Sequence, residues 1–170
     1  MSRAFVKESE EDATAGELPE RPLSAPPNYV TPRGLALLRE RLAELHVERD
    51  RLAAADDQLG RQRLQEVKRD IRYFNAQVER AEAVDPAAQP HDEVHFGATV
   101  TLVDGHDRRH VFQIVGDDEA DPAQRLISWA TPLARALIGA RVGDAVKWQR
   151  PDGASEVEVA AIDYAAPRSR

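Results

Sequence analysis

Two series of apolar heptad positions, separated by a very short connection, constrain the fold of this chain more than any other feature. The first series has the spacing of a coiled-coil seam and consists of Leu35, Leu38, Leu42, Leu45 and Leu52. The second follows Gly60 in alternating steps of three and four, as Leu64, Val67, Ile71, Phe74, Val78 and Ala81. Because only residues 53–60 connect the two series, the two helices must fold back antiparallel.

We therefore predict an antiparallel coiled-coil hairpin over residues 31–85. Thr31 can cap the first helix, and Pro32 suits its first position. Arms of about 25 residues should reach about 35–40 Å. Arg49 interrupts the seam, and it either faces a carboxylate across the hairpin or extends into water. Such a hairpin has one seam and almost no core, so we expect a spacer or a probe.

The segment before the hairpin has the composition of a disordered leader. Residues 1–30 contain an acidic cluster and four prolines without helical or strand periodicity, namely Glu8, Glu10, Glu11, Asp12, Pro19, Pro22, Pro26 and Pro27. The alternative is a partner-binding segment centred on Asn28, Tyr29 and Val30.

The segment after the hairpin predicts a small α+β domain over residues 91–165, which follows a proline-containing linker. Strands are expected at 98–103 and 110–115, around an Asp104-Gly105 turn, and at 126–129, 145–149 and 156–164. A short helix over 133–138 should end at Gly139. About 75 residues are enough for such a domain to fold alone.

Composition excludes several functional classes. The chain has no cysteine, which rules out disulfides, thiolate zinc sites and thiol catalysis. A formal charge of −7 argues against binding to free duplex DNA. No apolar run is long enough to span a membrane, and the start does not have the pattern of a secretory signal, so we expect a cytoplasmic protein. We also expect no metal or cofactor of its own: His106 and His110 stand at a turn, where no helix aligns them as ligands.

Three stretches of this sequence resemble the Gre transcript-cleavage factors, GreB more than GreA. They are YVTPRGLALLRERLAEL (29–45), RLQEVKRDIRYFNAQVERAEAVD (63–85), and the pair HFGATVTLVDGHDRRHVFQIVGDDEAD (95–121) and ISWATPLARALIGARVGDAVKW (127–148). The first two are similar to the coiled-coil arms of that family. The third is similar to its C-terminal domain, which has an FKBP-like fold and is also shared by the regulator of nucleoside diphosphate kinase.

The resemblance implies a regulator of bacterial RNA polymerase, with no catalytic residue of its own. In that family the C-terminal domain docks at the rim of the secondary channel, and acidic residues at the hairpin tip help the polymerase to hold its second Mg²⁺ for cleavage of backtracked RNA. Here only Asp56 and Asp57 remain at the turn, and each arm is shorter by about one heptad, or about 10 Å. A hairpin that short does not bring a carboxylate onto the metal unless docking shifts. One of the two acids can equally serve as a helix cap.

Further roles follow from the resemblance and stay open against simpler ones. A basic run on the second helix could contact nascent RNA, or it could pair with Glu44, Glu48 and Asp50 across or along the hairpin: Arg61, Arg63, Lys68, Arg69 and Arg72. The polymerase-docking residues are expected on the C-terminal domain, at Asp117, Asp118, Glu119 and Arg135.

The sequence thus predicts a monomeric factor that binds RNA polymerase at the secondary channel. It leaves open whether that factor rescues arrested complexes weakly or competes with other Gre factors. The alternative is an FKBP-like peptidyl-prolyl isomerase or chaperone-like binding module, which would need an aromatic-lined pocket. The available aromatic residues, several of them expected in the core, are Phe96, Phe112, Trp129, Trp148 and Tyr164.

Overall fold

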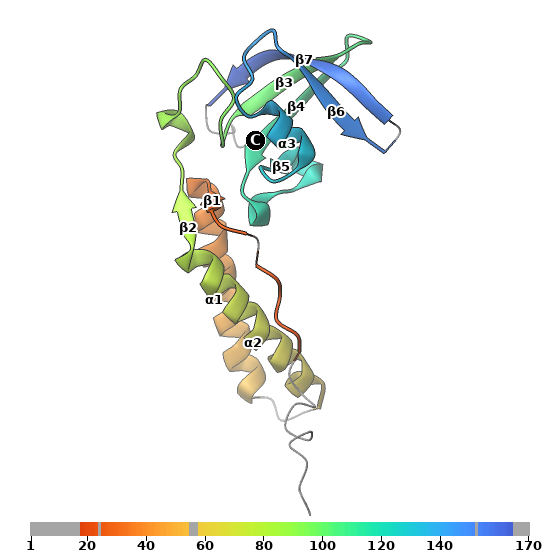
Figure 1. Cartoon of the computed structure of the whole chain (residues 1–170). Coiled ribbons are helices and arrows are strands. Elements are labelled where there is room, and N and C mark those ends of the chain that lie inside the picture. Colours follow the sequence, from red (N-terminus) through yellow and green to blue (C-terminus); the bar gives the residue numbers. More distant parts are fainter. Residues whose placement is uncertain (1–17, 24, 55–57, 152, 165–170) are drawn as a thin grey trace, which may run out of the picture.

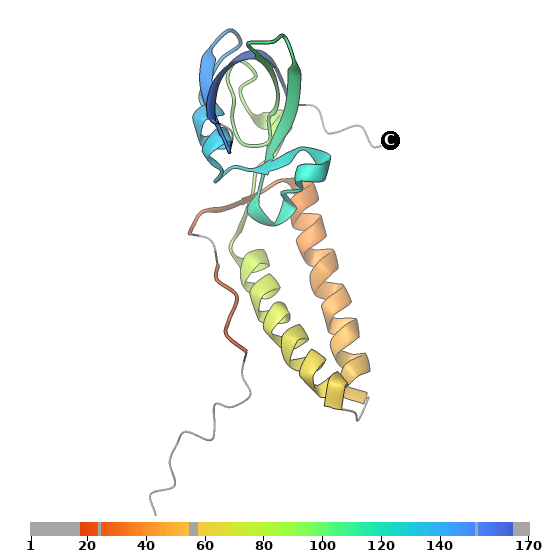
Figure 2. The same cartoon turned by 90° about the vertical axis from the view of Figure 1, so that its right-hand side faces the viewer.

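The structure, a computed structural model, describes residues 18–23, 25–54, 58–151 and 153–164. A two-helix hairpin projects from a small sheet domain, as Figures 1 and 2 show from two sides. The predicted α+β architecture, an N-terminal helical hairpin followed by a C-terminal sheet domain, is confirmed.

The hairpin consists of α1 (Pro32–Ala54) and α2 (Gln58–Glu79). Thr31 begins α1 as expected, since its hydroxyl accepts a hydrogen bond from the Gly34 amide at 2.9 Å. Leu45 and Val67 are fully buried in the seam together with Ile71, and Leu42, Leu52 and Phe74 pack against them. At about 1.5 Å per residue, each helix is about 34 Å long.

The connection between the helices is shorter than the sequence predicted. We expected it over residues 53–60, but α1 continues to Ala54 and α2 already begins at Gln58. Alanine, glutamine and leucine all favour helix, and their summed preference outweighs the cost of one glycine, Gly60, inside α2. Gly60 is buried in the hairpin.

The base of the hairpin departs from the prediction at both ends. The structure places residues 28–30, which we had assigned to the leader, in strand β1 (Asn28–Val30). This strand pairs in parallel with β2 (Ala81–Ala83), so Ala81 lies in a strand and not in the helical seam. The Asn28 side-chain amide also donates to the Gln77 carbonyl at 2.9 Å. Pairing between segments fifty residues apart leaves no local periodicity, which explains why the sequence did not reveal it.

The C-terminal domain contains a five-stranded sheet with the order β5-β4-β3-β7-β6. Its strands are β3 (Thr99–Asp104), β4 (Arg109–Val115), β5 (Leu126–Ser128), β6 (Ala145–Arg150) and β7 (Gly153–Asp163). Only the β4–β5 pair is parallel. Short 3₁₀ turns lie in the linker, η1 (Pro86–Ala88), and between β4 and β5, η2 (Asp117–Glu119) and η3 (Pro122–Gln124).

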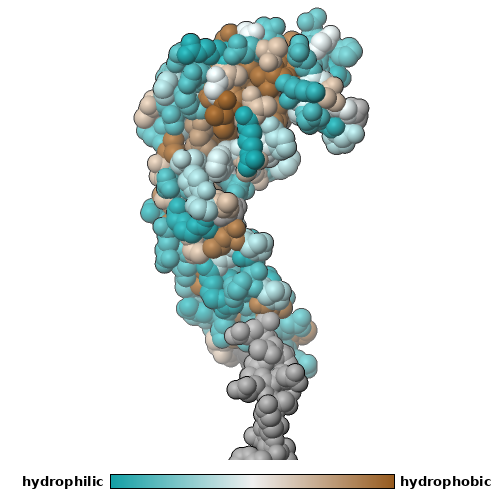
Figure 3. Space-filling model, in the orientation of Figure 1, coloured by the Kyte–Doolittle hydropathy of each residue, from teal (hydrophilic) through white to brown (hydrophobic). Residues whose placement is uncertain are grey.

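One apolar cluster fills the sheet domain between the sheet and the helix α3 (Pro132–Leu137). Leu102 and Ile114 from the sheet and Ala134 and Leu137 from the helix are fully buried in it. Thr131 caps α3 by accepting from the Ala134 amide at 3.3 Å. In the space-filling view the apolar side chains gather over this domain, whereas the hairpin surface is mainly hydrophilic (Figure 3).

Candidate functional site

The far end of the hairpin, where the sequence predicted an acidic tip, lies at the connection between α1 and α2. Asp56 and Asp57 lie outside the described residues, so their metal-directed and capping roles stay predictions. The described residues next to the connection include one strongly exposed apolar side chain, Leu59, with 79% of its surface accessible. The α1 side chain Val47 is 71% exposed.

The predicted basic run lies along α2, and its members have different surroundings. Arg63 forms a cross-hairpin ion pair with Glu48 at 2.8 Å and a second pair with Glu66 at 2.9 Å. The hydrogen bond from Arg63 lowers the pKa of Glu48, and the two carboxylates, Glu48 first, raise the pKa of Arg63. Arg63 therefore has the structural role that the simpler alternative predicted.

Three of the other four members of the run are more exposed than Arg63. Arg61, Lys68 and Arg72 are exposed, and Arg69 lies 3.4 Å from the carboxylate of Asp70. Arg72 donates to Glu20, a leader residue, from Nε at 2.8 Å and from Nη2 at 2.5 Å. A cationic strip thus remains on α2, but its pairing partners include a segment that the sequence analysis treated as disordered.

The remaining acids of the simpler alternative pair within their own helix. Glu44 contacts Arg41 at 2.9 Å, and Asp50 contacts Arg49 at 2.7 Å. The seam residue Arg49 is thus bound to its sequence neighbour at a partly exposed position. Neither contact crosses the hairpin.

Three of the four predicted docking residues lie at the junction between the sheet domain and the hairpin. Glu119 is only 8% exposed, and its carboxylate accepts from the Thr31 hydroxyl at 2.6 Å and lies 3.7 Å from Arg33. Asp117 accepts from the Ser128 hydroxyl within the sheet domain. Direct docking on a partner requires an accessible side chain, and Glu119 does not offer one because the hairpin base covers it.

Asp118 forms the second junction contact, with α2. Its carboxylate accepts from the Tyr73 hydroxyl at 2.9 Å and from the Gln77 side-chain amide at 2.5 Å. Burial and the hydrogen bond to Asp118 raise the pKa of Tyr73 to about 12. η2 therefore contacts both helices, through Glu119 to the start of α1 and through Asp118 to the second half of α2.

Two glycines permit this close approach. A Cβ atom at Gly34 would lie 2.6 Å from the Glu119 carboxylate, and one at Gly116 would lie 2.5 Å from the Tyr29 carbonyl. Both distances are shorter than real Cβ contacts, and the second involves backbone that cannot turn away. This junction was not predicted; its only local signals were Gly34, three residues after Thr31, and Gly116, directly before η2.

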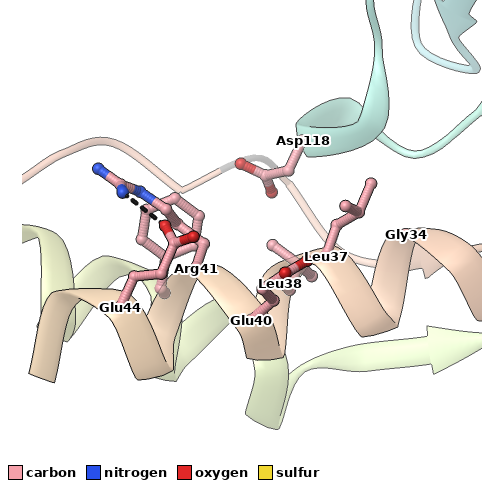
Figure 4. A pocket seen from close by; sticks show the side chains of 8 residues that line it. Gly34, Leu37, Leu38, Glu40, Arg41, Glu44 and Asp118 are labelled. Atoms are coloured by element: carbon pink, nitrogen blue, oxygen red, sulfur yellow. Dashed lines mark hydrogen bonds and ion pairs between the residues drawn. The ribbon is translucent and has the colours of Figure 1, made fainter. Parts of the chain in front are cut away.

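A groove of about 370 Å³ opens beside the junction (Figure 4). Apolar and charged side chains both line it, and the lining residues are Gly34, Leu37, Leu38, Glu40, Arg41, Glu44, Phe74 and Asp118. The Arg41–Glu44 pair at one end is drawn as a dashed line.

The fourth predicted docking residue, Arg135, is exposed on α3. Two apolar side chains close to it in sequence are also exposed, Ile138 at 40% and Val142 at 60%. This part of the sheet domain, unlike the junction acids, is an accessible surface of mixed character.

The histidines at the first turn serve the sheet. The hydrogen bond from His110, followed by those from the backbone amides of His106 and Arg108, holds the pKa of Asp104 well below its ordinary value. His110 also contacts the Trp148 ring edge-on. Within the described ranges, no group of three or more His, Asp or Glu side chains is arranged to hold a metal ion.

Comparisons with known proteins identify the family of this chain. A family model described as "Transcription elongation factor, GreA/GreB, C-term" matches residues 89–164. The transcription elongation factor GreB of Neisseria meningitidis serogroup A is 40% identical over 81% of this chain and 94% of its own length. GreA of Alkalilimnicola ehrlichii is 38% identical over 79% of this chain and 96% of its own. The crystal structure of GreA factor homolog 1 from Thermus thermophilus covers 79% of this chain and 97% of its own, with 26% identity and a TM-score of 0.38.

The chain belongs to the GreA/GreB family of transcription elongation factors. This membership does not favour the alternative of an isomerase or chaperone-like module. The aromatic side chains that such a module would need in a pocket belong to the core instead. Phe96 and Tyr164 are buried in it, and Phe112, Trp129 and Trp148 pack against it.

No described helix has the length and apolar character needed to cross a bilayer. Glu20 and Arg21 from the leader contact α2, which the sequence analysis did not foresee. Their composition gave no signal, since a short Pro-rich segment acquires a fixed place only from what it packs against.

Proposed function

We propose that this GreA/GreB-family protein binds RNA polymerase as an accessory factor, with the sheet domain docked at the rim of the secondary channel and the hairpin inside it. The single observation that carries the proposal is the projecting hairpin, whose far end is turned away from the sheet domain (Figure 2). A narrow channel admits such an element, and the junction through η2 would hold its direction once the sheet domain is docked.

The short hairpin sets the expected activity. Each helix has a length of about 34 Å, and the match with the Neisseria relative includes positions that this chain lacks. The match spans 153 positions but contains only 81% of this 170-residue chain, which is about 138 residues. About 15 of the matched positions therefore have no counterpart in this chain. Two missing heptads, one in each arm, would account for them.

We infer that the protein occupies the channel without bringing a carboxylate onto the catalytic metal, and that it competes with longer Gre factors. A carboxylate must lie about 2 Å from Mg²⁺ to serve as a ligand, and a tip set back by about 10 Å does not meet that demand. In this proposal the protein carries no cofactor or catalytic group of its own, and the only metal involved is polymerase-bound Mg²⁺.

The surfaces have separate proposed roles. The accessible cations of α2, with Arg72 among them, would face nascent RNA in the channel, while Arg63 holds the two arms together. Arg135 and the exposed Ile138 would contribute to docking. The junction acids Asp118 and Glu119 would set the hairpin direction relative to the docked domain. We propose a monomer acting in the cytoplasm, where the polymerase is.

The test is a transcript-cleavage assay on backtracked RNA polymerase, with and without a cleavage-competent Gre factor. We expect no acceleration by this protein alone and suppression of cleavage by the competitor, with half-suppression moving to higher concentrations as more competitor is added. Acceleration comparable with that of the competitor would overturn the inhibitory role. No binding to polymerase would overturn the proposal as a whole.

Placement is tested separately. Because the chain has no cysteine, a single Gln58→Cys variant can carry an iron chelate next to the far end of the hairpin. Cleavage of polymerase near the inner end of the secondary channel is expected, and a label at Ala154, in the sheet domain, serves as the control. In the same assays the Asp56→Ala, Asp57→Ala double variant should suppress the competitor as well as the wild type does.

A further inference from the structure

A segment of the leader lies against the second helix of the hairpin. Residues 18–23, which we call the leader strap, run beside α2 in both views (Figures 1 and 2). The Glu20 carboxylate accepts from the Arg72 guanidinium, from Nε at 2.8 Å and from Nη2 at 2.5 Å. The two residues are 52 positions apart, so this is a tertiary contact.

Arg21 fixes the strap on the helix next to that contact. Its guanidinium lies 3.8 Å from the centre of the Tyr73 ring and 5.3 Å from that of Phe74. One of its nitrogens also lies 3.4 Å from the carboxylate of Asp70. A cation stacked on an aromatic face and paired with a carboxylate has a defined position, and that position brings the neighbouring Glu20 to Arg72.

The Glu20–Arg72 ion pair is weak enough for another anion to displace it, and it can re-form because the strap stays attached to the base of the hairpin. The side chains of Arg72 and Glu20 are 52% and 59% exposed, and ion pairs at such positions are weak and screened by salt. The downstream end of the strap is held by the pairing of β1 with β2. A tethered carboxylate has a high effective concentration at its site, although it contributes little binding on its own.

We propose that the leader strap is a built-in competitor of nucleic-acid phosphate for the cationic strip of α2. One oxygen of the Glu20 carboxylate accepts from two guanidinium donors of Arg72, and a phosphate oxygen can accept from the same two donors. The strap therefore weakens contact between the hairpin and single-stranded RNA until RNA displaces it. This inference rests on the proposed RNA-facing role of α2 and adds its regulation.

The test compares binding of a short fluorescent single-stranded RNA by the free, full-length protein at low salt. Arg21→Ala gives the sharpest result, because it removes a cation. Simple electrostatics then demands weaker RNA binding, whereas release of the strap demands tighter binding. We expect tightening of about two- to five-fold, the range that an exposed pair of this strength can hold back.

Matched variants separate release of the strap from charge. Arg39→Ala removes an exposed cation from α1, and it should weaken RNA binding or leave it unchanged. Glu20→Gln should tighten binding more than Glu158→Gln, an equal charge change on the exposed face of β7. In an Arg72→Gln background, Glu20→Gln should then have no more effect than Glu158→Gln.

If Arg21→Ala binds RNA no more tightly than the wild type, the proposed role of the strap is wrong. The absence of measurable RNA binding in every variant would also overturn that role. Polymerase binding, measured separately with the wild type, decides the proposed function. A protein that binds polymerase but shows no effect of Arg21→Ala retains the proposed function and loses the strap. A protein in which Arg21→Ala tightens RNA binding, but which does not bind polymerase, retains the strap and loses the proposed function.

Discussion

The sheet domain and the hairpin bury apolar side chains in different ways. The sheet domain encloses one continuous cluster formed by β3, β4, β6, β7, α3 and the segments around them, with Leu102, Ile114 and Leu137 fully buried. The buried seam cluster of the hairpin consists of Leu45, Val67 and Ile71. The first region contains what it needs to fold alone, and the second takes much of its order from its base.

That base is built from contacts that belong to neither region alone. β1 pairs with β2 between the helices and the sheet domain (Figure 1), and η2 places Asp118 on α2 and Glu119 on the start of α1. The contacts with the sheet domain therefore set the direction in which the hairpin projects. Each prediction below tests this division, with tryptophan fluorescence reporting the sheet domain and helical circular dichroism reporting the hairpin. Trp129 and Trp148, the only tryptophans, both lie in the sheet domain.

The largest effect is expected from Leu102→Ala, in the centre of the sheet-domain core. Removing this fully buried side chain should lower the free energy of unfolding by about 2–5 kcal/mol. In urea denaturation the fluorescence and helical transitions should both move to lower urea, because the hairpin loses its contacts with the folded sheet domain. Val111→Ala, at a 39% exposed site on β4, is the control and should shift them little. A helical signal unaffected by Leu102→Ala would contradict the dependence of the hairpin on the sheet domain.

Leu45→Ala in the hairpin seam should act on one region only. We expect a loss of about 2–3 kcal/mol, at the lower end for buried leucines because a two-helix seam can partly close over the gap. The helical transition should move to lower urea while the tryptophan transition stays in place. Val47→Ala, at a 71% exposed position of the same helix, is the matched control. Coincident shifts of both signals would show that the two regions fold as one unit.

Glu119→Gln tests the junction between the regions. Neutralising this buried acceptor weakens its hydrogen bond from Thr31 and removes its ion pair with Arg33. The free energy of the helical transition should fall by about 1.5–3 kcal/mol, the range for hydrogen bonds to charged groups. The tryptophan transition should change less. Glu82→Gln, at an exposed position of β2, makes the same charge change and is the control. An equal effect in both variants would contradict the stabilising role of Glu119 at the junction.

The smallest effect concerns pH and Tyr73. Its pKa rises from 10.0 to about 12 in the folded protein, first through burial and then through Asp118. Below pH 10 the phenol is protonated in both states, so its stabilising contribution is complete. Between pH 10 and 12 it ionises first in the unfolded state, and that contribution is lost. Helical melting curves at pH 9 and 11 should therefore differ more for the wild type than for Tyr73→Phe; equal differences would contradict the raised pKa.

The sequence by itself determined the elements, because their signals are local. Heptad spacing identified both helices, and the turn at Asp104-Gly105 with the alternating strands around it identified the sheet domain. The cap at Thr31 and the end of α3 were likewise predictable, since a cap depends on a few adjacent residues.

Only the tertiary structure decided what joins these elements. The parallel pairing of β1 with β2, the burial of Glu119 against Thr31 and the seat of Arg21 on Tyr73 connect residues roughly fifty to ninety positions apart. Such contacts leave no periodicity in the chain, and a carboxylate has the same appearance in sequence whether it faces solvent or a neighbouring domain. The physical reason is that burial and pairing are properties of two surfaces brought together, and the sequence describes one surface at a time.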